Sequence, residues 1–287
     1  MPLCFFVSDL HGFISRYEKL FAAIATDRPE AVFIGGDILP SGTAVFMSAV
    51  FPYKDFLNDF LAVQFGILKD QLRERYPRVF VIMGNDDGRF EEDTVVELED
   101  RGIWEYIHNR KVAFGDFTVY GYNYVPPTPF LLKDWERYDV SRFVDPGCVS
   151  PEEGARSLPV SDHEKKFTTI QKDLELLAGE DDLSKAIFLF HTPPYKTNLD
   201  RAALDGKKID HVELDPYVGS IAVRRFIENR RPYLTLHGHI HESAELTGNW
   251  RDQIDNTPCF SAAHNGPELA LVRFDPMKLQ EASRELL

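Results

Sequence analysis

The sequence has little of what marks several protein classes. Its three cysteines, Cys4, Cys148 and Cys259, are far apart and form no Cys-x-x-Cys pair, which excludes a disulfide framework and a thiolate zinc site. No apolar run approaches the ~18–20 residues of a membrane span. The N-terminal apolar run lacks the basic flank and the small-residue cleavage site of a signal peptide. We therefore expect a cytoplasmic protein with no membrane partner.

Positive charge is also scarce. The 287 residues include 32 Lys and Arg against 46 Asp and Glu, for a formal net charge of −14. Phosphate backbones are bound by clustered Lys and Arg, so a long nucleic acid is not an expected partner. The acidity suits cation binding, and equally solubility alone. Hydrophobic residues make up 44% of the chain, enough for one large core, and we expect a single domain over residues 1–287.

Short apolar runs that end in polar or glycine-rich segments recur along the chain. Continuous runs of this length are typical of strands buried on both faces, as in an α/β sheet. The runs are LCFFV before Ser8-Asp9, AVFI before Gly35, VFVIM before Gly84, AIFLF before His191 and YLTL before His237. Segments 13–24, 161–177 and 220–229 have helical spacing, the last with Ser220 as its predicted N-cap. We therefore expect an α/β fold.

The chain changes character in two insertions and in its last quarter. We expect a helical, aromatic insertion at about 40–76 and an irregular, Pro-rich one at about 122–160. Each is either a functional lid or a surface decoration, and their aromatic parts, 51–65 and 122–135, are candidates for an interaction face. After His241, short runs beginning with SAEL predict an antiparallel meander and then a short helix near 277–286.

Residues able to bind a metal follow each of the five apolar runs. They are Asp9 and His11, Asp37, Asn85, His191, and His239 and His241. Residues two apart in an extended chain face the same side, and ligands of α/β sheets collect at the carboxyl ends of strands. Two divalent ions that share a carboxylate, for which Asp37 is the natural bridge, fit this set. His237 is expected instead to pack or to form hydrogen bonds within its strand.

Taken one at a time, these motifs are weak. Asp-Leu-His triplets occur by chance, Gly-Asn-Asp at 84–86 is also a common turn sequence, and a histidine after an apolar run is often structural. Gly-His-Ile-His at 238–241 is the most specific element. Their succession, each after a strand-like run, favours a metal site.

The order of these motifs resembles that of the calcineurin-like metallophosphoesterase superfamily. The motifs that carry the resemblance are Asp9-x-His11, Gly36-Asp37, Gly84-Asn85, His191 and Gly238-His239-x-His241, so it spans residues 9–241. It implies a four-layer α/β/β/α sandwich of two mixed sheets flanked by helices. It also implies that one ion is held by Asp9, His11, Asp37 and His241 and the other by Asp37, Asn85, His191 and His239. Such mixed oxygen and imidazole donors fit manganese, iron, zinc or nickel.

The chain departs from the family pattern at one position. The third motif of the family usually reads Gly-Asn-His followed by an acidic residue, and here Asp86 stands where that histidine acts near the leaving-group oxygen. The proton for the leaving group therefore has three possible explanations. Asp86 could donate it as a protonated acid, His264 from the C-terminal region could donate it, or a leaving group of low pKa could need no donor. His264 is equally a candidate for a structural histidine.

The predicted function is hydrolysis of a small phosphodiester or phosphomonoester by a hydroxide that bridges two divalent metal ions. The sequence has no Gly-x-Ser-x-Gly elbow, no P-loop and no His-Glu-x-x-His motif, so other hydrolase classes lack support. Lys196 and the helix start at Ser220 are candidates for contacts with the anionic substrate, and equally for shaping their loops. The alternatives are a catalytically weak or inactive metal-binding scaffold for protein partners, and a nuclease.

Overall fold

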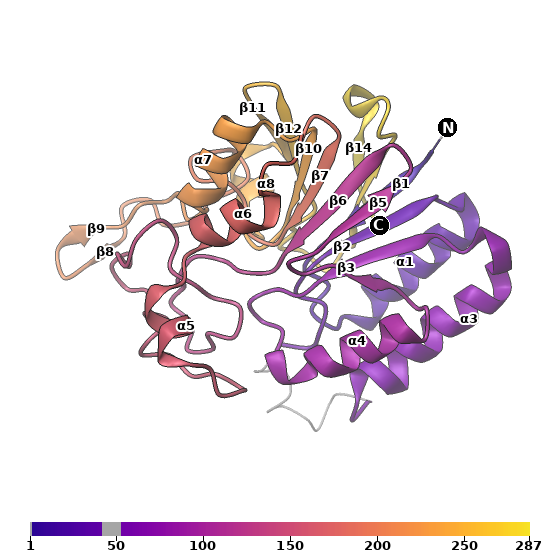
Figure 1. Cartoon of the computed structure of the whole chain (residues 1–287), viewed down its shortest axis with the longest axis horizontal. Coiled ribbons are helices and arrows are strands. Elements are labelled where there is room, and N and C mark those ends of the chain that lie inside the picture. Colours follow the sequence, from indigo (N-terminus) through magenta and orange to yellow (C-terminus); the bar gives the residue numbers. More distant parts are fainter. Residues whose placement is uncertain (1, 42–52) are drawn as a thin grey trace.

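Two six-stranded sheets form the centre of the molecule (Figure 1). The structure is a computed structural model and describes residues 2–41 and 53–287. The first sheet has the strand order β14-β13-β1-β2-β3-β4 and the second the order β11-β12-β10-β7-β6-β5. Parallel pairs such as β1–β2 and β7–β10 are bordered by antiparallel pairs such as β1–β13 and β5–β6, so both sheets are mixed.

The strands follow the apolar runs closely. The first sheet contains β1 (Cys4–Val7), β2 (Ala31–Gly35), β3 (Arg78–Ile82), β4 (Glu105–Tyr106), β13 (Ala270–Phe274) and β14 (Ser283–Leu286). The second contains β5 (Lys111–Phe114), β6 (Phe117–Tyr122), β7 (Ala186–Phe190), β10 (Leu234–His237), β11 (Arg251–Ile254) and β12 (Thr257–Ser261). A separate hairpin joins β8 (Lys208–Ile209) to β9 (Val212–Glu213).

The central strands are buried on both faces, as their continuous apolar runs predict. In β1, Phe5 and Val7 pack in one apolar cluster together with helix residues such as Leu20. Cys4 and Phe6 pack in a second cluster, which draws on both sheets and fills the space between them. Because side chains alternate along a strand, one apolar run contributes to the helix–sheet core and to the sheet–sheet core at once.

Helices cover the outer face of each sheet (Figure 1). On the side of the first sheet lie α1 (Ile14–Asp27), α3 (Ala62–Leu72) and α4 (Glu92–Asp100). On the side of the second lie α6 (Ile170–Ala178) and α7 (Ile221–Arg230), which pack against each other. The predicted α/β/β/α sandwich of two mixed sheets flanked by helices is thus confirmed.

The predicted helices are present, with one correction. Segment 13–24 forms α1, and segment 220–229 forms α7, where the Ser220 hydroxyl accepts the Val223 N–H as an N-cap. Segment 161–177 is not one helix: α5 (Asp162–Phe167) ends before Thr168, and α6 begins after Thr169. The side chain of Thr169 caps α6 by accepting the Lys172 N–H, so a second helix start follows the first.

The predictions for the last quarter of the chain are partly wrong. The SAEL segment belongs to a short helix, α8 (Ser243–Thr247), and not to a strand. The antiparallel pairs that follow are divided between the sheets, because β11–β12 extend the second sheet and β13–β14 the first. The tail helix expected near 277–286 is a 3-10 turn (Leu279–Glu281) followed by β14. There β14 pairs with β13 and completes the ladder at the sheet edge.

The two predicted insertions differ in structure. Within 40–76, residues 42–52 lie outside the described residues; the described remainder contains a π-helix (Phe56–Leu61), α3 and a 3-10 turn (Arg73–Arg75), so the helical expectation is met there. Residues 123–160 contain isolated bridges but no helix or strand. They enclose an ion pair between Lys133 and Glu136, whose side chains are fully buried. In the described ranges, no helix combines the length and the apolar character that crossing a bilayer requires.

Candidate metal centre

The carboxyl ends of five strands carry the predicted metal ligands. Asp9 and His11 follow β1, Asp37 follows β2, Asn85 follows β3, His191 follows β7, and His239 and His241 follow β10. In the first sheet β1, β2 and β3 are parallel neighbours, and in the second β7 and β10 are. Parallel neighbours end at the same edge of a sheet, so each sheet gathers its donors at one edge. The Asp9 carboxylate accepts the His239 N–H at 3.0 Å, which joins the two edges.

Four of the predicted ligands have left-handed backbone conformations. The φ angles are 56° for Asp9, 46° for His11, 49° for Asp37 and 73° for His239. Such angles are unfavourable for residues other than glycine, and they persist where surrounding bonds hold them, typically at functional sites. Here the Asp9 N–H donates to Gly36 O at 3.0 Å and the His11 N–H donates to Asp37 O at 2.7 Å. The loop after β1 is therefore fastened to the loop after β2.

One group of donors consists of Asp9, His11, Asp37 and His241, whose possible ligand atoms all lie within 4.8 Å of one another. His241 Nε2 is 3.2 Å from Asp9 Oδ1 and 3.0 Å from His11 Nε2. His11 Nε2 is in turn 3.7 Å from Asp37 Oδ2. The structure thus brings together the four residues that the family resemblance assigns to one ion.

A second group consists of Asp37, His191 and His239, again within 4.8 Å. His191 Nε2 lies 3.2 Å from Asp37 Oδ2 and 3.1 Å from Asn85 Oδ1, and the His191 and His239 ring centroids are 5.1 Å apart. Asp37 belongs to both groups, and its Oδ2 faces an imidazole of each. A carboxylate between two such groups is the arrangement that a bridging ligand requires.

Hydrogen bonds from neighbouring groups orient the imidazoles. His191 Nδ1 lies 2.7 Å from Gly35 O; with its proton on that nitrogen, Nε2 is left as the metal-binding atom. His237 behaves differently, as predicted. Its two ring nitrogens contact Thr192 O and Thr235 Oγ1, and its ring stacks on Phe190. His237 therefore packs inside the second sheet and supports the chain that leads to His239.

The charged groups of the centre shift one another's pKa values. Burial disfavours the charged form of Asp9, but the hydrogen bond and charge of His241 lower the pKa of this carboxyl to about 2. Burial also disfavours the His11 and His191 imidazolium ions, yet neighbouring carboxylates raise the pKa of each to about 9. For His239, burial and the nearby His191 lower the pKa to about 3. The ionised carboxylates thus stabilise protons on the His11 and His191 imidazoles, and bound cations would displace those protons.

Two glycines leave space for this arrangement. A Cβ at Gly36 would lie 2.7 Å from His191 Nδ1, and a Cβ at Gly84 would lie 2.3 Å from Asp37 Oδ1 and 2.6 Å from His191 Nε2. Any side chain at these positions would displace a donor. The close glycine contacts, the buried carboxylates and the mixture of carboxylate, amide and imidazole groups all fit a pair of divalent cations.

Asp86 lies at the edge of the first group. Its N–H donates to Asp37 Oδ1 at 2.8 Å, and its carboxylate Oδ2 is 3.3 Å from His11 Nδ1. About a third of the side chain is exposed. The Asp86 carboxylate therefore contacts His11, a residue of the candidate metal centre. The spacing of these residues along the chain did not predict this contact.

His264, the other predicted acid, is bonded elsewhere. Its Nε2 lies 2.9 Å from Glu268 Oε2 within the same loop. This loop is connected to the centre through Arg16, whose guanidinium donates to Asp9 O and to Gly266 O. Sequence reasoning missed Arg16, although a charged residue on the apolar face of a predicted helix was the available signal. A catalytic role for His264 stays a prediction.

Asp87 is a second residue that sequence reasoning missed. Its fully buried carboxylate accepts the N–H groups of Ile38, Leu39 and Gly84, and so joins the loop after β2 to the loop after β3. Burial, with the charge of Asp37, raises its pKa to about 7 against the lowering effect of these hydrogen bonds. Asp87 thus fixes the spacing of the strand ends that carry two of the predicted ligands.

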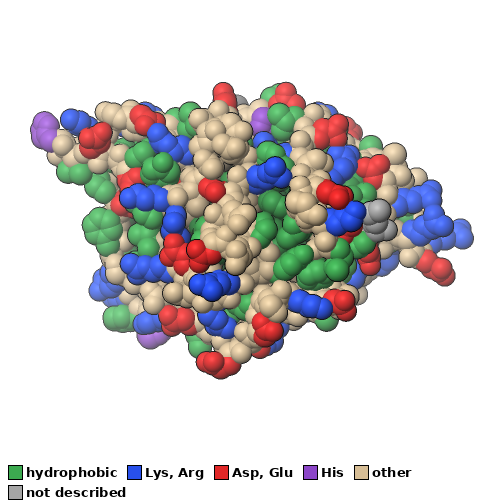
Figure 2. Space-filling model, turned by 90° about the horizontal axis from the view of Figure 1, so that it is seen from above, with side chains coloured by type: hydrophobic (Ala, Val, Ile, Leu, Met, Phe, Trp, Pro, Cys, Tyr) green, Lys and Arg blue, Asp and Glu red, His purple; other side chains and the backbone are tan. Residues whose placement is uncertain are grey.

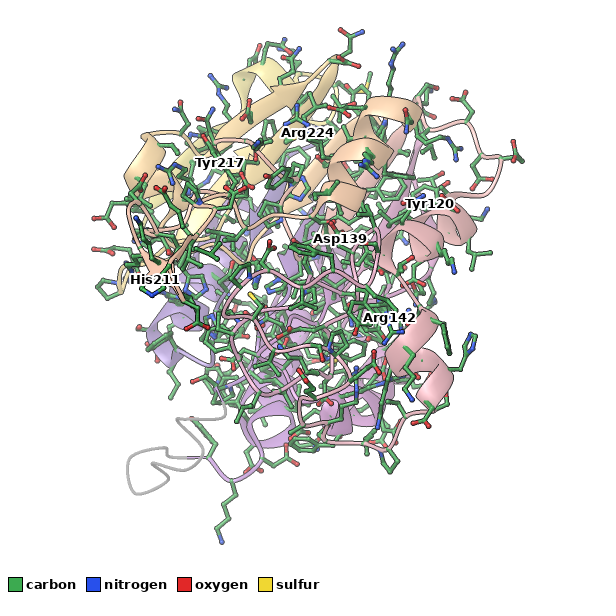
Figure 3. All side chains as sticks on the ribbon, turned by 90° about the vertical axis from the view of Figure 1, so that its left-hand side faces the viewer. Tyr120, Asp139, Arg142, His211, Tyr217 and Arg224 are labelled. Atoms are coloured by element: carbon green, nitrogen blue, oxygen red, sulfur yellow. The ribbon has the colours of Figure 1, made fainter. Side chains whose placement is uncertain are left out.

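The predicted substrate contacts have structural partners. The Ser220 hydroxyl is buried, accepts the Val223 N–H and donates to Asp139 Oδ1 at 2.5 Å. The Asp139 carboxylate also accepts the first N–H groups of α7, so the protein's own anion occupies this helix start (Figure 3). Lys196 Nζ lies 5.2 Å from the centroid of the Tyr195 ring. These bonds do not favour Ser220 as a substrate contact; both assignments stay predictions.

Comparisons with known proteins agree with this geometry. The family model for calcineurin-like phosphoesterases matches residues 4–243. A solved structure from Thermus thermophilus has a TM-score of 0.57 at 14% identity, covering 99% of this chain and 98% of its own. The phosphopantetheinyl hydrolase of Mycobacterium tuberculosis has a TM-score of 0.51 at 16% identity, with coverages of 93% and 90%. No curated protein sequence matches.

A dimetal phosphatase from Danio rerio is similar to the same extent, with a TM-score of 0.50, 11% identity and coverages of 94% and 91%. At such low identities these likenesses concern the fold alone. The family model is the stronger finding, because it spans most of the sequence and includes every motif that contributes a predicted ligand. The chain therefore belongs to the calcineurin-like phosphoesterase family.

Proposed function

We propose that this protein is a dinuclear metal-dependent phosphoesterase that hydrolyses a small phosphodiester or phosphomonoester. The observation that carries the proposal is the position of Asp37, whose buried carboxylate belongs to both donor groups. A shared carboxylate sets two cations close enough to act on one phosphoryl group. Two similar structures are named as a phosphopantetheinyl hydrolase and a dimetal phosphatase, and these names support the same reaction class.

Each residue of the centre has a role in this proposal. Asp9, His11, Asp37 and His241 would hold one ion, and Asp37, Asn85, His191 and His239 the other; manganese, iron, zinc or nickel suits these donors. When bound, the two ions would acidify a water molecule and neutralise the phosphoryl oxygens. The protein's part is to hold its donors in place, with Gly35 O orienting His191 and the His239 N–H orienting the Asp9 carboxylate.

Long nucleic acids are unfavourable substrates in this proposal. The net charge of −14 opposes association with a polyanion. On the face drawn in Figure 2, Lys and Arg alternate with Asp and Glu and form no continuous basic surface. A nuclease would bind its backbone through clustered cations. A small phosphoester makes no such demand, because it needs contacts only at the metal centre and its immediate surroundings.

The test combines metal analysis with a substrate screen. Metal-free protein would be loaded with manganese, zinc, iron or nickel, assayed by elemental analysis, and then offered bis-p-nitrophenyl phosphate, p-nitrophenyl phosphate and a single-stranded oligonucleotide. We expect about two ions per chain and turnover of at least one small ester. Asp37→Asn should lose both together, whereas Asp162→Ala, on an exposed turn of α5, should lose neither.

Three outcomes would contradict the proposal. Full metal occupancy without turnover of any ester would favour the scaffold that binds metal but does not catalyse. Turnover confined to the oligonucleotide would favour a nuclease. Retention of both ions by Asp37→Asn would show that the shared carboxylate does not bridge them.

A further inference from the structure

We infer that Asp86 is a positioning residue, which holds the metal-binding face of His11 toward the first cation site and does not protonate the leaving group. The inference rests on the proposed function, because it assigns His11 to a metal ion. It concerns the one position where this chain departs from the family's third motif. What the sequence presents as a missing acid is, in the structure, a carboxylate that supports a metal ligand.

The two ring nitrogens of His11 face different partners. Nε2 faces the donor group, 3.0 Å from His241 Nε2 and 3.7 Å from Asp37 Oδ2. Nδ1 faces outward, 3.3 Å from Asp86 Oδ2. A neutral imidazole has one donor nitrogen and one acceptor nitrogen, and the partner of the first determines which nitrogen can bind a metal. With its proton on Nδ1 beside Asp86, His11 presents the lone pair of Nε2 to the cation site.

His191 offers a comparison within the same centre. Its Nδ1 lies 2.7 Å from Gly35 O, and its Nε2 faces Asp37 and Asn85. One imidazole of each donor group is therefore oriented through Nδ1, in one case by a backbone carbonyl and in the other by the Asp86 carboxylate. Carboxylates and carbonyls commonly take this place behind metal-bound histidines.

Asp86 is itself held in place by the centre. Its N–H donates to Asp37 Oδ1 at 2.8 Å, while its carboxylate contacts His11. One residue thus restrains both the shared carboxylate, on the side opposite the imidazoles, and the ring of His11. His11 has φ of 46° on a loop without regular structure, so its ring depends on such contacts for its orientation.

The same geometry argues against Asp86 as the general acid. An acid must direct a protonated oxygen at the leaving group. Asp86 directs its Oδ2 at a ring nitrogen instead. If Asp86 gives no proton, and His264 stays bonded to Glu268, the leaving group departs with the stability of its own anion. The preferred substrates are then esters of acidic alcohols or phenols, or phosphoric anhydrides.

The first arm of the test is metal affinity, measured by calorimetric titration of metal-free protein with Mn²⁺ or Zn²⁺. Asp86→Ala should weaken one of the two sites by about 10–100-fold and leave the other within a few-fold, as is usual when the partner of a metal-bound histidine is removed. Asp86→Asn keeps an oxygen that accepts the His11 proton but cannot serve as an acid. It should recover most of the affinity. Asp116→Ala, on the exposed turn between β5 and β6, is the matched control.

The second arm is the dependence of kcat/KM on the pKa of the leaving phenol, in a series of aryl phosphates at saturating metal. The slope should be the same for the wild type, Asp86→Asn and Asp86→Ala. Unchanged affinity in Asp86→Ala, or losses in both variants that grow as the phenol becomes less acidic, would overturn the inference and assign the acid role to Asp86. A wild type that binds two ions but cleaves no ester would refute the proposed function alone, because the affinity comparison would still stand.

Discussion

At the scale of single residues, the centre depends on positions where even a methyl group has no space. Gly84 is one of them, since a Cβ there would lie 2.3 Å from Asp37 Oδ1 and 2.6 Å from His191 Nε2. The Gly84-Asn85 motif contains this glycine, but the sequence did not show why glycine is needed there. The residue serves less as a flexible turn than as a gap that lets two donors of the second group approach the backbone.

Gly84→Ala should therefore weaken metal binding by at least about 10-fold, because either donor must move, and should cost about 1–3 kcal/mol of unfolding free energy as an overpacked site does. Calorimetric metal titration and urea unfolding measure the two effects. Gly66→Ala in α3 is the control, because a Cβ there has no neighbour within 4 Å. Equal metal affinity in both variants would show that the loop relaxes freely.

His108 is a second residue whose environment has a measurable consequence. Its Nδ1 accepts the Asn123 N–H at 3.1 Å. Burial, with the charges of Arg137 and Arg89, holds the pKa of His108 well below the ordinary 6.5. The unfolded chain therefore takes up a proton first as the pH falls, so this residue's contribution to stability is complete above pH 6.5 and declines below it.

Replacement by a group that does not titrate should flatten this dependence. In urea unfolding at pH 7.5 and 5.5, the wild type should lose more stability between the two values than His108→Gln does. The comparison between variants removes the contribution of every other titrating group. A loss of the same size in both proteins would mean that His108 remains neutral in the unfolded chain or becomes charged in the folded one.

At the scale of elements, the helix starts show what local sequence predicts and what it misses. The Ser220 cap of α7 was predicted from residue type and spacing. The Asp139 carboxylate, which comes from the irregular segment 123–160, was not, because its partners lie 81–83 residues away in the sequence. It accepts the Ser220 hydroxyl and two N–H groups of α7. Ser220 in turn donates its N–H to Pro193 O, two residues after His191.

Asp139→Ala should lower the unfolding free energy by about 2 kcal/mol, because it removes a half-buried helix cap and its favourable interaction with the helix dipole. Urea unfolding of the metal-free protein gives the value. Asp162→Ala in the first turn of α5 is the matched control, since that carboxylate is 82% exposed and should contribute less than about 0.5 kcal/mol. If the two variants lose equal stability, Asp139 is not the cap that fastens α7.

The misassigned elements have a common cause. One helix was expected over 161–177 because the apolar period continues through it, but the backbone of Thr168 and Thr169 is extended and Thr169 starts a new helix. A helix was expected at 277–286, yet Ser283–Leu286 pairs with β13 at the edge of the first sheet. An available strand edge outweighed a weak local preference for helix. Local periodicity carries no information about such an edge.

At the scale of the whole molecule, the metal centre connects the two sheets, so its ligands should contribute to global stability. The first sheet supplies Asp9, His11, Asp37 and Asn85, and the second supplies His191, His239 and His241. The direct bond between the His239 N–H and the Asp9 carboxylate already joins the two edges. A cation held from both sides would bind the folded chain alone, because unfolding separates its ligands.

Metal should therefore raise the melting temperature. An ion present at about 100 times its Kd stabilises the fold by about 2.7 kcal/mol, which for a chain of this length is an increase of about 4 °C. Differential scanning calorimetry of EDTA-treated protein, with and without Mn²⁺, measures the change. Asp37→Asn should melt at the same temperature in both conditions. A wild type indifferent to every divalent cation offered would contradict a site shared by the two sheets.

The sequence by itself determined the strand runs, the order of the donors that follow them and the family resemblance, because these features depend on residue type and short spacing. Only the tertiary structure decided that Asp86 lies behind His11, that Asp87 joins two loops, that Arg16 contacts the Asp9 carbonyl and that Asp139 caps a distant helix. Each of these contacts depends on how loops from different strands meet. Local periodicity along the chain does not determine these contacts between loops, because they depend on how the two sheets and their helices pack.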